Sequence, residues 1–191
     1  MKPLAELNFY TGYFLTSKGT LHTYLPVYDK LFTPFRNKKI NIFEVGYLFG
    51  GSAKLMELYF PKAIIKTIDV TTTFPYSWCK EAEARGETTN IEMGSRTSME
   101  LKDSLTLTPD YFTDFVPDIA IDDGGHSLES QLHFVKTVYP VLREGGLLIV
   151  EDIQDYDNQK EEFEKLGYKF YTIDKRNETG RYDDVLLIYK K

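Results

Sequence analysis

The sequence predicts an α/β fold of the doubly wound type, whose sheet is mostly parallel and ends in an antiparallel hairpin. Two observations predict it. Short aliphatic runs alternate with helix-length segments between residues 40 and 166, and parallel strands covered on both faces read as such continuous runs. The tail, residues 168–190, holds two strand-like runs joined only by KRNETG, which leaves no room for a helix and indicates a hairpin.

Five strands and five helices are expected before the tail. The strand-like runs lie at 40–45, 63–70, 90–93, 118–121 and 145–151, so the tail brings the sheet to seven strands. The helical segments lie at 52–60, 76–86, 97–105, 128–142 and 158–166. Gly167 follows the last of them, as is typical of a helix C-terminus.

The first 39 residues are rich in aromatic side chains. Pro26 stands where the first turn of a helix tolerates proline. Apolar residues then recur at helical spacing, at Tyr28, Leu31, Phe32 and Phe35. We therefore expect a helical segment over 1–39 that covers a core of residues 40–191, both within a single domain.

The composition excludes several classes of protein. The chain has 191 residues, enough for one domain with a sizeable core but cramped for two. Its 23 basic and 29 acidic residues give a net charge of -6, so we expect no nucleic-acid partner. Cys79, the single cysteine, can form no intramolecular disulfide, and no apolar run reaches the length of a bilayer span. These features favour a cytoplasmic protein without a membrane span.

A glycine-rich turn, FEVGYLFGGS, follows the first expected strand. Gly46, Gly50 and Gly51 let the backbone approach a ligand, and a helix opens at about Ser52. The dinucleotide fingerprint G-x-G-x-x-G is not met, because Leu48 stands at its second glycine. That glycine makes room for a pyrophosphate, so the turn favours a nucleoside ligand that lacks one. A purely structural turn is the alternative.

Two further segments stand at the same edge of the expected sheet. Asp69 ends the second strand, where an acidic residue can accept hydrogen bonds from a ribose; a simple turn aspartate is the alternative. Gly94 and Ser95 follow the run at 90–93, and the alternative is a helix N-cap formed by Ser95 or Thr97.

Four carboxylates follow the fourth and fifth strands, as Asp122, Asp123, Glu151 and Asp152. Neighbouring parallel strands bring these ends together, and so much negative charge is unfavourable without a cation. Oxygen ligands suit Mg²⁺, and not every one of the four need be a ligand, because alternation along each strand sends neighbouring side chains to different sides. Solvated acids at strand ends are the alternative.

His126 lies three residues after Asp123, on the loop over the same edge. A neutral imidazole can take a proton from a hydroxyl, so His126 is the candidate general base. His133 falls within the expected helix at 128–142 and is interpreted as a packing residue.

Together these motifs resemble class I S-adenosylmethionine-dependent methyltransferases, which have a Rossmann-like fold. That family carries E-x-G-x-x-x-G after its first strand, matched by Glu44, Gly46 and Gly50, and an acid after its second, matched by Asp69. The resemblance implies S-adenosyl-L-methionine as cofactor. The residues it places near the cofactor are Glu44, Gly46, Tyr47, Gly50, Ser52, Asp69, Gly94, Ser95 and Asp122, with Asp69 at the ribose and Gly94 and Ser95 near the adenine.

The string IDDGGH…FVKTVYPVLREGGLLIVEDI is similar to the metal-dependent sugar O-methyltransferases of the macrocin and mycinamicin type. The resemblance implies Asp123, Glu151 and Asp152 as ligands of Mg²⁺ or another divalent cation, and His126 as the base. Asp123 is then the metal candidate of its pair, and Asp122 is expected to support the loop. Gly125 departs from the serine that is usual in the family.

The segment TSKGTLHTYLPVYDKLF also resembles a segment of these relatives, except that Ser17 replaces the usual aspartate. It suggests Lys18, His22 and Tyr24 as residues that cover cofactor or substrate. An aromatic helix that only packs on the sheet is the alternative.

The predicted function is Mg²⁺-assisted transfer of a methyl group from S-adenosylmethionine to a sugar hydroxyl. The expected acceptor is a small molecule or glycan with vicinal hydroxyls, and a homo-oligomer stays open. Three alternatives remain. A catechol-like diol would chelate the metal equally well. A nucleotide-binding oxidoreductase or epimerase is disfavoured by the missing glycine and by the lack of a well-placed Tyr-x-x-x-Lys pair. A non-catalytic cofactor-binding module would not require the acidic residues and His126.

Overall fold

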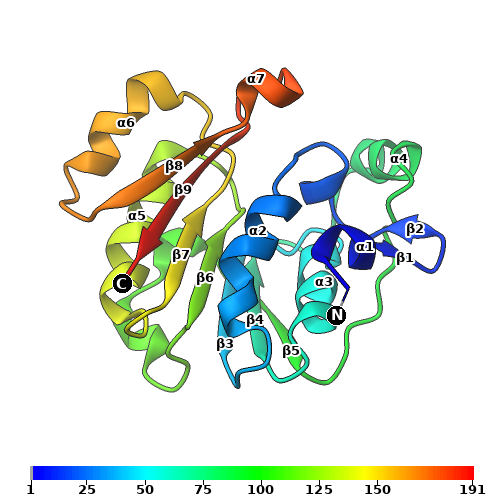
Figure 1. The fold of residues 1–191 in the computed structure, drawn as a ribbon, viewed down its shortest axis with the longest axis horizontal. Coiled ribbons are helices and arrows are strands. Elements are labelled where there is room, and N and C mark those ends of the chain that lie inside the picture. Colours follow the sequence, from blue (N-terminus) through cyan, green and yellow to red (C-terminus); the bar gives the residue numbers. More distant parts are fainter. Residues whose placement is uncertain (1) are drawn as a thin grey trace.

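A seven-stranded sheet forms the centre of the computed structural model, which describes residues 2–191 (Figure 1). The strand order is β5-β4-β3-β6-β7-β9-β8. The first five strands in this order run parallel to one another, and β9 is antiparallel to both β7 and β8. The doubly wound fold with its C-terminal hairpin is therefore confirmed. The strands are β3 (Asn41–Val45), β4 (Ile64–Asp69), β5 (Thr97–Leu101), β6 (Ile119–Asp122), β7 (Leu147–Val150), β8 (Phe170–Asp174) and β9 (Val185–Lys190).

Helices cover both faces of this sheet, because successive side chains of its central strands point to opposite sides. On one face Ile42 and Ile65 pack with helices α1 to α3; on the other, Phe43 and Ala120 pack with α5 and α6. In Figure 1, α2 crosses in front of the sheet and α5 lies behind it. The helices are α1 (Leu4–Asn8), α2 (Leu25–Phe32), α3 (Gly51–Tyr59), α4 (Tyr76–Ala84), α5 (Leu128–Val138), α6 (Tyr156–Glu164) and α7 (Arg176–Thr179).

The N-terminal segment folds onto the same face as α3. Helix α2 has Pro26 in its first turn and buries Tyr28 and Phe32, which confirms the helix expected there. The segment also contains a small hairpin, β1 (Phe9–Tyr10) with β2 (Tyr13–Phe14), that the sequence pattern did not indicate. One-turn 3₁₀ helices complete the chain at η1 (Ser17–Gly19), η2 (Thr33–Phe35), η3 (Ser104–Thr106), η4 (Pro109–Phe112) and η5 (Tyr139–Val141).

The strand expected at 90–93 and the helix expected at 97–105 are both wrong. Residues 90–96 have no regular structure, and the strand is β5, at the edge of the sheet. Arg96 explains the shift, because its guanidinium donates to carbonyl oxygens at the end of α3, those of Glu57 at 2.8 Å and Phe60 at 2.8 Å. These bonds hold the segment against α3, and pairing with β4 begins only afterwards, at Thr97.

The tail also departs from expectation in one respect. The hairpin of β8 and β9 is confirmed, but its connection contains α7, a helix of one turn that ends at Gly180 with φ 74°. Glycine adopts this left-handed conformation without penalty, so a single turn fits where no helix was expected. Across residues 2–191, none of the helices combines the length and apolar character needed to cross a membrane.

Candidate active site

A cavity of about 620 Å³ lies at the carboxyl ends of the parallel strands. This is where open α/β sheets bind ligands. Each of the five parallel strands contributes a residue at or just beyond its end, namely Gly46 after β3, Asp69 at the end of β4, Lys102 after β5, Asp123 after β6 and Asp152 beyond β7.

The glycine-rich turn forms one wall of this cavity. Gly46 has φ 94° and Gly50 φ 80°, conformations that residues with a side chain rarely adopt. A Cβ on Gly46 would lie 1.9 Å from the carbonyl oxygen of Asp123, so the turn and the loop after β6 are in contact. Likewise a Cβ on Gly51 would lie 1.6 Å from the carbonyl oxygen of Leu15. Glycine is therefore required where the turn meets the loop after β6 and the segment around Leu15.

Asp69 holds the same turn in place. Its Oδ2 accepts hydrogen bonds from the backbone N–H groups of Tyr47, at 2.8 Å, and Leu48, at 3.1 Å. Its Oδ1 accepts from the N–H of Thr71 at 3.3 Å. Asp69 lines the cavity, as expected for a ribose-binding acid, and it also organises the cofactor turn, which the sequence did not indicate. Its contact with a ribose stays a prediction.

Of the other predicted cofactor residues, Gly46, Tyr47 and Ser52 line the cavity, Gly50 and Asp122 do not, and Glu44 lies beneath it. Glu44 is 1% exposed, and its Oε1 accepts a hydrogen bond from Ser52 Oγ at 2.6 Å. Burial raises the pKa of Glu44 to about 7, although Lys18 and Ser52 act in the opposite direction. Glu44 therefore supports the wall through Ser52.

Gly94 and Ser95 do not line the cavity. They precede β5, whereas the sequence analysis placed them after a strand at 90–93. The backbone N–H of Gly94 donates to Glu57 on α3 at 2.9 Å. The segment that follows β5, residues 102–105, takes their expected place at the cavity. Within it, Asp103 caps η3 by accepting from the N–H of Leu105 at 2.9 Å. The correct strand assignment would have pointed to this segment.

An aromatic group lines the cavity beside the turn. Phe49 and Phe74 contact each other edge to face, with ring centroids 5.5 Å apart, and Trp78 stacks on Phe74 at 6.3 Å. Trp78 is 50% exposed, so part of its surface is open to a ligand or a partner. The sequence analysis did not identify this apolar wall.

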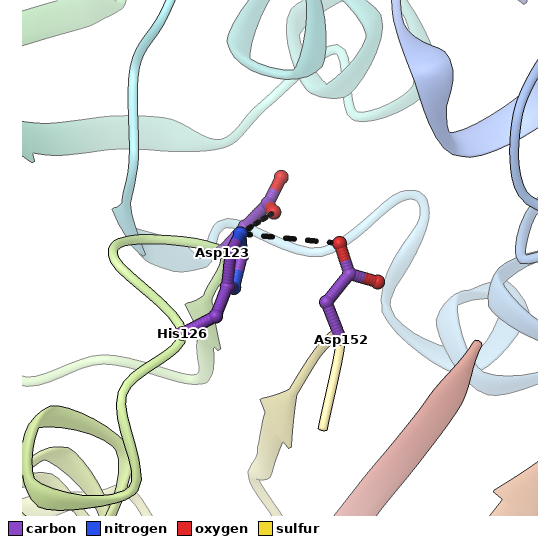
Figure 2. Close-up of side chains that lie close together, drawn as sticks. All are labelled: Asp123, His126 and Asp152. Carbon is purple, nitrogen blue, oxygen red and sulfur yellow. Dashed lines mark ion pairs between the residues drawn. The ribbon is translucent and has the colours of Figure 1, made fainter. Parts of the chain in front are cut away.

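Asp123, His126 and Asp152 converge where the loops after β6 and β7 line the cavity (Figure 2). His126 Nε2 lies 4.0 Å from Asp123 Oδ1 and 3.9 Å from Asp152 Oδ2. Both His126 and Asp152 have φ 55°, a conformation that is costly for residues other than glycine and that concentrates at functional sites. The loops after β6 and β7 thus hold these two side chains at a cost in backbone energy.

The donor set fits a divalent cation. One ligand atom each from Asp123, His126 and Asp152 lies within 4.8 Å of the others. Hard cations such as Mg²⁺ prefer carboxylate oxygens to an imidazole nitrogen and keep several waters. Glu151, the third ligand that the resemblance implies, belongs instead to a second set with Glu44 and Asp123. It is 1% exposed and accepts hydrogen bonds from Lys18 and Tyr28.

Lys18, His22 and Tyr24 reach the acidic residues from behind and are buried, rather than lying on the cavity wall. Tyr24 OH donates to Asp152 Oδ1 at 2.6 Å, and the His22 ring stacks on Tyr24 at 4.8 Å. His22 Nδ1 lies 3.2 Å from Asp184 Oδ1. The segment thus contacts carboxylates, among them Asp184, which the sequence analysis did not single out, and Glu151, which Tyr28 reaches.

Asp122 and His133 occupy the supporting positions expected for them. Asp122 is 2% exposed, and its Oδ1 accepts from the N–H of Gly124 at 3.3 Å, which stabilises the loop that carries His126. Burial raises the pKa of Asp122 to about 7. His133 Nε2 lies 3.0 Å from the carbonyl oxygen of Leu107, within the packing of α5.

Sequence relatives of the chain are sugar O-methyltransferases. It is 29% identical over 156 residues to demethylmacrocin O-methyltransferase of Streptomyces fradiae, a match that covers 78% of the chain and 36% of the relative. It is 28% identical over 157 residues to mycinamicin VI 2''-O-methyltransferase of Micromonospora griseorubida, covering 78% of the chain and 36% of that relative. The chain therefore spans about a third of the length of these relatives. No family model matches it.

Solved structures share the fold. The MycE methyltransferase of the mycinamycin pathway, in complex with Mg, SAH and mycinamycin VI, superposes with a TM-score of 0.59 at 23% identity, over 81% of the chain and 38% of that protein. A Methanococcus jannaschii fibrillarin, a pre-rRNA processing protein, matches with a TM-score of 0.53 at 18% identity, over 81% of the chain and 67% of that protein. Sequence and fold together confirm the resemblance to class I S-adenosylmethionine-dependent methyltransferases, and among them to the macrocin and mycinamicin type.

Proposed function

We propose that the chain transfers a methyl group from S-adenosylmethionine to a sugar hydroxyl, with the help of Mg²⁺ or another divalent cation. One observation carries the proposal: Asp123, His126 and Asp152 converge on the same cavity that the glycine-rich turn lines. A cofactor on the turn and an acceptor beside these three residues would then meet inside one cavity.

The acceptor class follows from the relatives. Two of them are named for methylating rhamnosyl tetracenomycin compounds and a third for an olivosyl compound, at 23–27% identity. Vicinal hydroxyls of such sugars can chelate a cation held by Asp123 and Asp152. We therefore propose a glycoside, glycan or nucleotide-linked sugar as acceptor, in preference to a catechol-like diol.

Each residue has a defined part in the proposed reaction. When bound, S-adenosylmethionine supplies an electrophilic methyl group, and a divalent cation supplies positive charge beside the acceptor hydroxyls. His126 accepts the hydroxyl proton at Nε2, the ring nitrogen that faces the cavity. Asp123 and Asp152 hold the cation, and the turn at Gly46 orients the cofactor. The apolar wall at Phe74 and Trp78 excludes water from the cofactor.

Calorimetry with S-adenosylhomocysteine tests the cofactor assignment. We expect binding of S-adenosylhomocysteine and none of NAD⁺, because the turn lacks the glycine that admits a pyrophosphate. The matched measurement with and without Mg²⁺ shows whether the cation is needed for the cofactor or only for the acceptor. Binding of NAD⁺ and not of S-adenosylhomocysteine would refute the proposed function.

The affinity for Mg²⁺ should rise with pH. Burial above all, and then the charge of Asp123, raise the pKa of Asp152, while His22 and Tyr24 act against them. A cation binds the ionised carboxylate, so protons compete with it up to the raised pKa, and the competition ends above it. Calorimetric titrations with Mg²⁺ at a series of pH values, from the ordinary aspartate pKa of about 3.9 upward, measure the change. An affinity that falls over this range would contradict Asp152 as a ligand.

A further inference from the structure

Two sets of possible metal ligands share Asp123. We name Glu44, Asp123 and Glu151 the inner set, and Asp123, His126 and Asp152 the outer set; in each, one ligand atom per residue lies within 4.8 Å of the others. All three members of the outer set line the cavity, whereas Glu44 and Glu151 are each 1% exposed. The two sets therefore differ in access, and they also differ in what already lies between their oxygens.

The inner set already contains a cation, the ammonium of Lys18. Its Nζ lies 2.7 Å from Glu151 Oε1 and 3.7 Å from Glu44 Oε1, and it also donates to Asp123 Oδ2. The Lys18 side chain is 1% exposed, so water does little to screen these contacts. An ammonium has three donors and no acceptor, which suits a position among carboxylate oxygens.

Local structure fixes Lys18 in this position. Residue 18 lies in η1, where Thr16 Oγ1 accepts from the Lys18 N–H at 3.3 Å. Asn8 in turn holds Thr16, since Asn8 Oδ1 accepts from the Thr16 N–H at 3.0 Å and Asn8 Nδ2 donates to the Thr16 carbonyl at 3.3 Å. The ammonium is thus placed by a buried hydrogen-bond network and is not a chance conformation of a surface lysine.

We propose that Lys18 is the resident cation of the inner set and directs a divalent metal to the outer set. This inference rests on the metal in the proposed function. A divalent ion among the inner oxygens would lie a few ångströms from a buried ammonium, where repulsion between like charges is strong. Asp123 serves both sets: Oδ2 contacts Lys18, and Oδ1 faces His126.

The proposal changes the part played by Glu151. The resemblance implies Glu151 as a metal ligand, whereas its Oε1 receives both the Lys18 ammonium and the hydroxyl of Tyr28. Glu151 then balances the charge of Lys18 and keeps it directed at Asp123. Lys18 is a positioning residue, since it orients Asp123 without facing the cavity.

The stoichiometry of Mn²⁺ binding, measured by electron paramagnetic resonance on the full chain without cofactor or acceptor, tests this. We expect one ion per native chain and two in Lys18→Ala, because the substitution removes the ammonium and leaves room for an ion in the inner set. Lys18→Arg keeps the charge and should bind one ion. Lys165→Ala, which changes an exposed lysine at the C-cap of α6, should also bind one.

Asp152→Asn gives a second test in which Lys18 is unchanged. Because Asp152 belongs only to the outer set, we expect the Mn²⁺ affinity to fall at least about tenfold. Native affinity in Asp152→Asn would locate the ion in the inner set and overturn the proposal, even if Lys18→Ala does not fold. A folded Lys18→Ala that binds a single ion would overturn this proposal alone, whereas a native chain that binds no Mn²⁺ would also refute the metal in the proposed function.

Discussion

Replacing His126 should slow methyl transfer by about 10²–10⁴-fold, the usual contribution of a positioned general base. The affinity for S-adenosylhomocysteine should change little, because the glycine-rich turn and Asp69, which are assigned to the cofactor, keep their hydrogen bonds to each other in this variant. Single-turnover methyl transfer, with product detected by mass spectrometry, measures the first quantity, and calorimetry measures the second.

The choice of variant matters at this position. His126 has φ 55°, so alanine would add backbone strain to the loss of the base. His126→Asn avoids this, because asparagine tolerates the left-handed conformation and cannot act as the base. His133→Gln is the matched control on α5 and should keep native turnover. A His126→Asn protein with native turnover would show that another group accepts the proton.

Gly46→Ala should reduce the free energy of unfolding by about 3–5 kcal/mol, near the upper end for a single substitution. Two costs combine. Alanine is disfavoured at φ 94°, and its Cβ would lie 1.9 Å from the carbonyl oxygen of Asp123, which is backbone and cannot rotate away. The turn and the loop after β6 must then separate, so S-adenosylhomocysteine affinity should fall as well.

Gly145→Ala separates the two costs. Gly145 has φ 76°, but a Cβ there meets nothing within 4 Å, so only the backbone term of about 1–2 kcal/mol is expected. Urea denaturation of both variants, with and without S-adenosylhomocysteine, measures the difference. Equal destabilisation of the two variants would mean that the close approach of Gly46 to Asp123 adds nothing to the loss of unfolding free energy.

Most of the sheet could be predicted because its central strands are buried on both faces. Residues 119–121 and 147–150 are aliphatic throughout, and the alternation of such runs with helices indicates that the strands are parallel. The edge strand β5 offers no such signal, since its residues are half-buried or exposed. Arg96, which sets where β5 begins, acts through bonds to α3 that sequence periodicity does not reveal.

The site was predictable to the extent that it depends on strand ends. The position of Asp123 and Asp152 beside His126 follows from the adjacency of β6 and β7. The separation of Glu151 from Asp152 does not, because neighbouring residues diverge only once the backbone beyond β7 turns, with Asp152 at φ 55°. Nor could spacing show that Lys18 lies among residues more than a hundred positions away; only the folded N-terminal segment brings them together.

The contacts of Lys18 show that the N-terminal segment and the sheet depend on each other. The Lys18 ammonium joins carboxylates 105 and 133 residues further along, across the boundary at residue 39 that the sequence suggests between a cover and a core. A polypeptide that began at residue 40 would retain every strand of the seven-stranded sheet, yet Glu44 and Glu151 would lose both the ammonium of Lys18 and the Tyr28 side chain that contacts Glu151. Residues 1–39 and the acidic residues at the ends of the parallel strands are thus one electrostatic unit, and a change of charge in either part leaves the other unbalanced.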